Sequence, residues 1–209
     1  MKAIDFVSDL YKKIKTFILG KKPDRDFSVL EHIPQLGDCI LIESDSLIAD
    51  GIEWMSCGKV SHAAIYVGGG KRKIIEALSE GVKVKTLDKY FKNDYTITIR
   101  RITGLKVNQA EEMKAFAYDQ VDKPYDFNQF ISLGLYFLAN KMGLDDVLRW
   151  FGYDVDEHVD DNENAIICSE LYVRAAKEAG ITLCGRKNLS LITPQDLLKS
   201  TKMETIAEV

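Results

Sequence analysis

Between residues 37 and 102 the chain alternates short apolar runs with turn residues. The runs cover five segments, 39–42, 60–67, 73–78, 81–85 and 95–100. Runs of this length predict β-strands, and the alternation of apolar and polar side chains in the last two predicts strands with one buried face. The glycines of Gly68-Gly69-Gly70 are typical of a tight turn. We therefore expect these strands to form an antiparallel meander.

After residue 107 the apolar residues recur at helical spacing. The helices expected from this pattern cover 108–121, two stretches within 127–152, Cys168 to Gly180, and a short helix from Thr193-Pro194. Gly180 suits a helix C-terminus, and proline is favoured in the first helical turn. The sequence thus predicts strands in its first half and helices in its second half.

Residues 1–20 also carry apolar side chains at helical spacing, with lysines among them. The simpler interpretation is a helix packed on the domain surface, and the alternative is a basic amphipathic helix that contacts a membrane surface or a partner. The segment lacks the features of a secretory signal, and the chain contains no apolar stretch of about 18 or more residues. We therefore expect a cytoplasmic protein without a transmembrane segment.

The composition limits the class of protein. The chain has 209 residues, of which 46% are hydrophobic, and a formal net charge of −4. This is enough for one domain with a substantial core, and the slightly acidic balance argues against nucleic acid as the main partner. The four cysteines form no Cys-x-x-Cys motif and no close Cys/His pair, so we expect neither a metal site nor a cofactor.

A cysteine and a histidine suggest catalysis. Cys168 opens a predicted helix, where the positive end of the helix dipole favours the thiolate, and His62 lies in a predicted strand. An imidazole within reach of a thiol is the pairing that a cysteine nucleophile needs. Taken alone, each residue also has a structural explanation, as a small apolar side chain or as a histidine with satisfied hydrogen bonds. Cys39, Cys57 and Cys184 lie mid-strand or in loops and are weaker candidates.

The glycine turn after His62 supplies a possible third member of the site. If the hairpin turn centres on Gly69, Glu76 lies directly opposite His62 on the same face of the sheet. Its carboxylate would then accept a hydrogen bond from one ring nitrogen and leave the other nitrogen for the thiol. A bulge in the turn would shift the register by one residue and turn Glu76 away. Tyr66 has the same strand parity as His62 and is a candidate for lining the substrate site.

Six segments, in their order along the chain, resemble the circularly permuted branch of the NlpC-type papain-like amidases. The segments are Gly37-Asp38 with the strand that follows, Ser61 to Gly68, Ile75-Glu76-Ala77, Pro124-Tyr125-Asp126, Cys168-Ser169-Glu170-Leu171 and Thr193-Pro194-Gln195-Asp196-Leu197. YiiX-like and YaeF-like bacterial proteins and, more distantly, lecithin–retinol acyltransferase belong to this branch. In it the catalytic histidine precedes the cysteine in the chain.

The resemblance implies an α+β fold in which an antiparallel sheet packs against helices. It implies that Cys168 is the nucleophile, with His62 and the polar Glu76 on neighbouring strands, and that an acyl-enzyme forms on attack at an amide or ester carbonyl. Backbone amides near Cys168 would supply part of the oxyanion hole. A papain-like domain would then span 34–209, with an N-terminal helical extension, 1–33, and a helical insertion at about 127–163.

The function expected from these residues is a thiol-dependent amidase or peptidase that cleaves a small peptide-like substrate, with cell-wall peptide as one candidate. One alternative is a lipid acyl hydrolase or acyltransferase with the same triad, which would be favoured if the apolar segment 127–163 forms a substrate groove. The other alternative is a binding module whose thiol is incidental.

Overall fold

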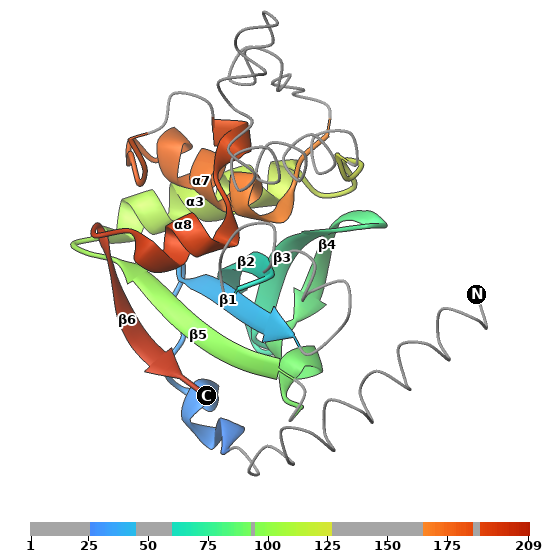
Figure 1. The fold of residues 1–209 in the computed structure, drawn as a ribbon, viewed down its shortest axis with the longest axis vertical. Coiled ribbons are helices and arrows are strands. Elements are labelled where there is room, and N and C mark those ends of the chain that lie inside the picture. The colour runs from blue at the N-terminus through green and yellow to red at the C-terminus, as the bar shows by residue number, and fades with distance from the viewer. Residues whose placement is uncertain (1–25, 45–59, 93–94, 127–164, 186–188) are drawn as a thin grey trace, which may run out of the picture.

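A computed structural model gives the structure of five parts of the chain, residues 26–44, 60–92, 95–126, 165–185 and 189–209. Figure 1 shows an antiparallel sheet with the helices gathered along one side of it. The strands are β1 (Cys39–Ser44), β2 (His62–Gly68), β3 (Lys73–Leu78), β4 (Gly81–Thr86), β5 (Tyr95–Ile102) and β6 (Met203–Glu208). The helices are α3 (Val107–Asp119), α7 (Cys168–Glu178) and α8 (Pro194–Lys199). Three 3-10 turns accompany them, η1 (Phe27–Glu31), η2 (Leu87–Tyr90) and η3 (Leu189–Leu191).

The five strands predicted from the sequence are all present, but the meander is only partly right. The order across the sheet is β4-β3-β2-β1-β5-β6, so β1 to β4 form a meander, whereas β5 pairs with β1 instead of β4. β1 explains this arrangement, because its first four residues, Cys39 to Ile42, are all buried. A continuous apolar run is typical of a strand covered on both faces. Such a strand lies inside the sheet and needs a neighbour on each side.

Strand β6 was not predicted from the sequence. It pairs with β5 at the edge of the sheet, and most of its side chains are partly or fully exposed. Because only Met203 is buried, the segment lacks the strict alternation that identifies a strand in a sequence. The helices predicted within 1–20 and 127–152, and the proposed insertion at 127–163, lie outside the described residues.

Two apolar cores form on opposite faces of the sheet. The larger lies between the sheet and the helices, where α7 contributes Leu171, Tyr172, Ala175 and Ala176. The second includes Ile40, Ile42, Ala64 and Ile74 together with Leu30 of η1, and the last residue of the chain, Val209, packs against it. Figure 1 accordingly shows the C-terminus next to η1. Both cores support β2 and β3, the strands that carry His62 and Glu76.

Helix α7 is attached to the sheet by polar as well as apolar contacts. Tyr172 has no exposure to water, and its hydroxyl donates a hydrogen bond to the carbonyl oxygen of Gly37 at 2.8 Å, just before β1. In the first turn of the helix, Ser169 donates to the carbonyl oxygen of Ile192 at 2.6 Å. These two contacts fix the position of the N-terminus of α7, where Cys168 lies.

Glycine at position 81 permits a close approach between β4 and the chain after α3. Gly81 has φ +97°, and a Cβ atom there would lie 2.6 Å from the carbonyl oxygen of Lys123. The same carbonyl accepts a hydrogen bond from the backbone N–H of Val82 at 2.8 Å. This contact holds the segment that continues to Tyr125, which pairs with Ile166 in an isolated parallel bridge.

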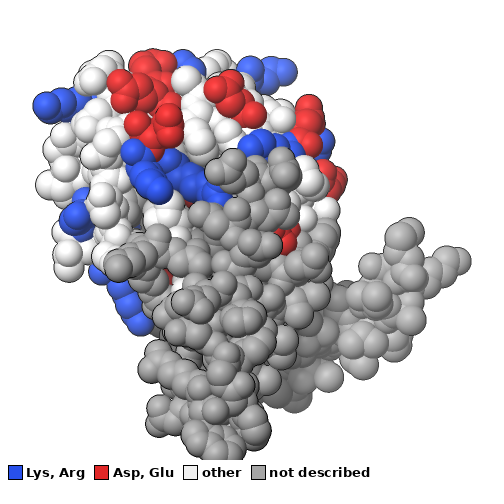
Figure 2. Space-filling view, turned by 90° about the horizontal axis from the view of Figure 1, so that it is seen from above, with Lys and Arg blue, Asp and Glu red and all other residues white. Residues whose placement is uncertain are grey.

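Acidic and basic side chains are interspersed over the described part of the surface seen from above in Figure 2. Among the helices in the described ranges, none has the length and apolar character needed to cross a membrane.

The Tyr172 contact leads to a stability prediction. Tyr172→Phe should lower the free energy of unfolding by about 1–3 kcal/mol, because it leaves the buried carbonyl oxygen of Gly37 without this donor. The matched control is Tyr118→Phe on α3, where the side chain is 39% exposed and little change is expected. Urea unfolding measures both variants, and equal losses would show that the Tyr172 hydroxyl does not hold α7 to the sheet.

Candidate active site

Cys168 is the first residue of α7 and lies beside the beginning of β2. It is 8% exposed. Its side chain is hydrogen-bonded to His62, and the backbone N–H groups of Ala63 and Ser169 donate to its sulfur. The Ser169 group belongs to the first turn of α7, whose N–H groups have no partner within the helix. The sulfur therefore lies where an imidazole, two amides and the positive end of a helix dipole favour a negative charge.

His62 is the first residue of β2 and pairs with Ile42 of β1. Its side chain is 17% exposed, so one edge of the ring is accessible to water or substrate. The Nε2 atom lies 2.7 Å from Oε2 of Glu76. This contact leaves Nδ1, the other ring nitrogen, for the hydrogen bond to Cys168. The structure thus brings together the three residues that the sequence pointed to.

The register that places Glu76 near His62 differs from the predicted one. Ile65 pairs with Ile75 and Tyr66 with Ile74, and continuing this register places Glu76 opposite Ala64 rather than opposite His62. A bulge between Tyr66 and Gly68 closes the hairpin. Because the difference from the prediction is two residues, Glu76 stays on the same face as His62. The two side chains meet along the diagonal between strands, a distance that long side chains can span.

Glu76 has no exposure to water, and two residues of η2 also bind it. The hydroxyl of Tyr90 donates to Oε2 at 2.6 Å, and the ammonium of Lys89 donates to Oε1. Neither residue was predicted from the sequence, because Leu87-Asp88-Lys89-Tyr90 carries no motif and its contact with Glu76 depends on the path of the chain after β4. The nearest sequence signal is a lysine and a tyrosine shortly after the expected strand 81–85.

The charges of the site stabilise one another. Burial opposes ionisation of all three groups, but the sulfur of Cys168 and the carboxylate of Glu76 outweigh it and raise the pKa of His62 to about 9. Burial likewise opposes a charge on Glu76, yet His62 and Lys89 lower the pKa of that carboxyl to about 2. Burial would also raise the pKa of Cys168, and the charge and hydrogen bond of His62 lower it instead. These shifts all favour the same charged arrangement, a thiolate, an imidazolium and a carboxylate in sequence.

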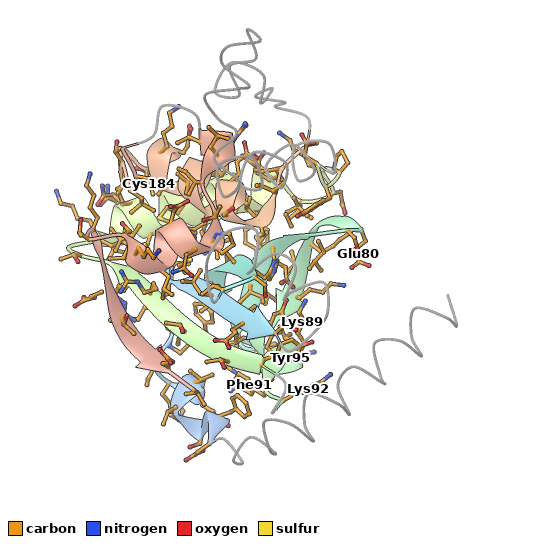
Figure 3. The ribbon with its side chains drawn as sticks, viewed as in Figure 1. Glu80, Lys89, Phe91, Lys92, Tyr95 and Cys184 are labelled. Atoms are coloured by element: carbon orange, nitrogen blue, oxygen red, sulfur yellow. The ribbon has the colours of Figure 1, made fainter. Side chains whose placement is uncertain are left out.

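The other described cysteines have different surroundings. Cys39 is fully buried in β1, and burial together with the charge of Asp38 raises its pKa well above the ordinary value. Cys184 is partly buried, and Figure 3 shows it in the helical part of the molecule, well separated from Lys89. Cys57 lies outside the described residues. In contrast to Cys39, Cys168 has a lowered pKa.

Tyr66 shares the face of His62 but lies four residues further along β2. It is buried in the second core, opposite Ile74, and near the charges of Arg72, Asp38 and Asp88. A strand rises about 3.3 Å per residue, so this position is roughly 13 Å from the imidazole. Its predicted role in lining the substrate site stays a prediction.

Tyr125 is a second tyrosine that the geometry brings toward the sulfur. Burial raises its pKa, and the negative charges of Cys168 and Asp126 raise it further. Its hydroxyl therefore stays protonated at neutral pH and can act as a hydrogen-bond donor. The sequence analysis quoted Pro124-Tyr125-Asp126 without giving this residue a role.

Comparison with known proteins identifies the family. The sequence profile described as "Permuted papain-like amidase enzyme, YaeF/YiiX, C92 family" matches residues 34–136, about half of the chain. The matched residues include His62 and Glu76 and end before Cys168. Among individual proteins, the "Probable lipoprotein peptidase YaeF" of Escherichia coli strain K12 is 27% identical over 106 residues. This alignment covers 51% of the present chain and 38% of the length of YaeF.

A solved structure extends the similarity in fold beyond the matched segment. The crystal structure of "metalloprotein yiiX" from Escherichia coli O157:H7 matches with a TM-score of 0.60 and 20% sequence identity. The match covers 85% of the present chain and 98% of the yiiX chain. At this identity the match shows the fold, an α+β arrangement with an antiparallel sheet against helices. The predicted family and fold class are therefore confirmed, and the chain belongs, through residues 34–136, to the permuted papain-like amidases of the YaeF and YiiX type.

Proposed function

We propose that this protein is a cysteine amidase or peptidase that cleaves an amide bond through Cys168, His62 and Glu76. The observation that carries the proposal is the hydrogen-bonded series from the sulfur through the imidazole to the buried carboxylate. The family is one of amidases and peptidases, which supports amide hydrolysis as the reaction. The cysteine mechanism rests on the geometry around Cys168, which lies outside the matched segment.

In the proposed reaction, the thiolate of Cys168 attacks the carbonyl carbon of the scissile amide and forms a C–S bond. The carbonyl oxygen takes up the negative charge of the tetrahedral intermediate. The imidazolium of His62 then gives its proton to the leaving amine, the C–N bond breaks and a thioester remains. Neutral His62 next removes a proton from water, the hydroxide attacks the thioester, and the carboxylic acid leaves as the thiolate–imidazolium pair reforms.

The start of α7 supplies donors for the oxyanion. The N–H of Cys168, at the first helical position, has no intrahelical acceptor and points along the helix axis as the amides of a helix start do. The hydroxyl of Tyr125, which stays protonated near Cys168, is a second candidate donor. Donors fixed in advance at such a position stabilise the transition state more than the ground state.

The substrate class in this proposal is a small peptide-like molecule, with cell-wall peptide as a candidate. The family description and the name of the relative YaeF, a probable peptidase, support a peptide over a lipid ester. The neighbour yiiX is called a metalloprotein. Within the described ranges of this chain, no three or more His, Cys, Asp or Glu side chains are grouped to hold a metal ion, so no step of the mechanism is assigned to one. The cytoplasmic location stays a prediction, and YaeF is named a lipoprotein.

The reactivity of the thiol tests the proposal without knowledge of the substrate. Iodoacetamide should alkylate Cys168 readily at about pH 6.5, because the charge and hydrogen bond of His62 lower the pKa of this thiol from the ordinary cysteine value of about 8.5. In His62→Ala the alkylation rate at this pH should fall by at least about tenfold. Peptide mapping by mass spectrometry separates Cys168 from Cys39, which should react only after unfolding. Equal rates at the two cysteines, or no effect of His62→Ala, would contradict the proposal.

The pH dependence of kcat/KM should show a broad plateau. Its acid limb reports protonation of the Cys168 thiolate. Its alkaline limb should lie at about pH 9, because the raised pKa of His62 keeps the ring protonated below that pH and lets it lose the proton above. A profile in which activity already falls near pH 6.5, the ordinary imidazole value, would show that His62 is not paired with the thiolate.

Substitutions should rank the roles of the three residues. Cys168→Ser and His62→Ala should each reduce kcat/KM by about 100-fold or more, with the fold retained by circular dichroism. Glu76→Gln should cost less than His62→Ala, because the carboxylate orients the base and moves no proton itself. The matched control is Glu80→Gln on the β3–β4 turn, where the carboxylate is 57% exposed and should not affect the rate. Equal losses in Glu76→Gln and His62→Ala would contradict an orienting role for Glu76.

A further inference from the structure

Both oxygens of the Glu76 carboxylate are bound by η2. Oε2, which faces His62 at 2.7 Å, also accepts a hydrogen bond from the hydroxyl of Tyr90 at 2.6 Å. Oε1 accepts from the ammonium of Lys89. Donors on both oxygens fix the carboxylate in rotation as well as in place. The direction of the His62 contact therefore depends on residues that do not reach Cys168.

The turn that carries these donors is itself fixed to the β2–β3 hairpin. Leu87 and Tyr90 are three residues apart, which places them on the same side of a 3-10 turn, and both are buried. Arg72 of the hairpin binds Asp88 with two hydrogen bonds of 2.7 and 2.9 Å. The backbone N–H of Leu87 donates to the carbonyl oxygen of Arg72 at 2.9 Å. The donors and the catalytic hairpin therefore form one packed unit.

Lys89 stabilises the negative charge of the Glu76 carboxylate, which water does not reach. Its side chain is 31% exposed, so the ammonium contacts solvent on one side and the buried carboxylate on the other. The same ammonium lies 4.5 Å from the centre of the Tyr90 ring, a favourable cation–π distance. Figure 3 shows Lys89 in the same region of the molecule as Phe91 and Tyr95, which both follow it in the chain.

We propose that Lys89 and Tyr90 are positioning residues that keep Glu76 ionised and directed at His62. Lys89 then completes a series of four alternating charges that starts at the thiolate of Cys168. This inference rests on the proposed cysteine mechanism. It assigns control of the catalytic charge pair to a turn that does not touch the sulfur.

The other charged and titratable groups around Glu76 have different partners. Lys83 of β4 is opposite Glu76 in the sheet register but donates to Asp122 at 2.7 Å. Lys85, also on β4, donates to Glu80 at 2.8 Å, although it still feels the charge of Glu76. Tyr95 of β5 packs edge-to-face against the Tyr90 ring, with ring centres 5.1 Å apart. Burial and the charge of Glu76 raise the pKa of Tyr90, so its hydroxyl remains a donor at all working pH values.

The test is the pH dependence of Cys168 alkylation and of kcat in Lys89→Met. The substitution keeps the apolar stem but removes the charge, so the pKa of Glu76 should rise. Once protonated, Glu76 no longer stabilises the imidazolium of His62. We expect the acid limb of both profiles to move up by about one pH unit or more. KM should be unchanged, because the proposed role of Lys89 acts through Glu76 and not on the substrate. Lys89→Arg restores the charge and should return the acid limb of both profiles most of the way to its wild-type pH.

Two further variants separate charge from structure. Lys83→Met removes the same charge from the adjacent strand without removing a contact to Glu76, and its profiles should match the wild type. Lys89→Gln keeps a hydrogen-bond donor without the charge and should still show the upward shift, which keeps the test decisive if Lys89→Met does not fold. Tyr90→Phe should lower kcat and shift the acid limb in the same direction by a smaller amount.

The outcomes distinguish this inference from the proposed function. If wild-type Cys168 is not alkylated at pH values below the ordinary thiol pKa, the cysteine mechanism itself is wrong. If the wild type is reactive but Lys89→Met and Lys89→Gln have wild-type profiles, the mechanism stands and the positioning role is overturned. A shift of equal size in Lys83→Met would also overturn it, because net charge alone would then explain the effect.

Discussion

The site depends on one ionised carboxylate that has no contact with water. An uncompensated charge buried in this way costs several kcal/mol, so Glu76 is tolerated only because His62, Lys89 and Tyr90 all bind it. These partners come from β2 and from η2, while Cys168 comes from α7. The charges are therefore balanced only when the hairpin, the turn and the helix are docked together. The groups of the candidate site are therefore assembled only when the chain folds.

The contrast between two cysteines shows how far surroundings decide reactivity. Cys39 and Cys168 both pack within the larger core. Cys39 is the first residue of β1, next to Asp38, and its pKa is raised. Cys168 lies at a helix start, where His62 and the amides of Ala63 and Ser169 lower its pKa. Similar burial thus accompanies a raised pKa in one thiol and a lowered pKa in the other, because His62 and the two amides surround only Cys168.

The sequence predicted the residues of the site better than it predicted their geometry. Cys168, His62 and Glu76 were found because a helix start, a strand and a glycine turn are all local patterns. The register was wrong by two residues, since the bulge beside Gly68 depends on how the hairpin closes. A shift of two residues leaves Glu76 on the same face of the sheet as His62, and this is why the predicted contact still forms. Helix α3, expected at 108–121 and observed at Val107–Asp119, shows the same accuracy for a strong local pattern.

What the sequence could not show depends on contacts between distant segments. Lys89 and Tyr90 reach Glu76 only because η2 packs back on the hairpin, and no spacing in the sequence reports that packing. Strand β6 forms by pairing with β5, about a hundred residues earlier in the chain. The pairing of β5 with β1 likewise reflects the need of a doubly buried strand for two neighbours. In each case tertiary contacts determine the structure where local propensity is weak.

The protonation state of His62 is the most direct test of the account. Long-range ¹⁵N–¹H spectra of the labelled protein can follow both ring nitrogens through a pH titration, with His62→Ala to assign the signals. The proposed charge pair requires an imidazolium with both nitrogens protonated at neutral pH and a titration midpoint at about 9. It also requires that this midpoint falls in Cys168→Ser, where the thiolate is gone. A neutral ring at pH 7, or a midpoint unaffected by the loss of the sulfur, would contradict the charge pair on which the mechanism is built.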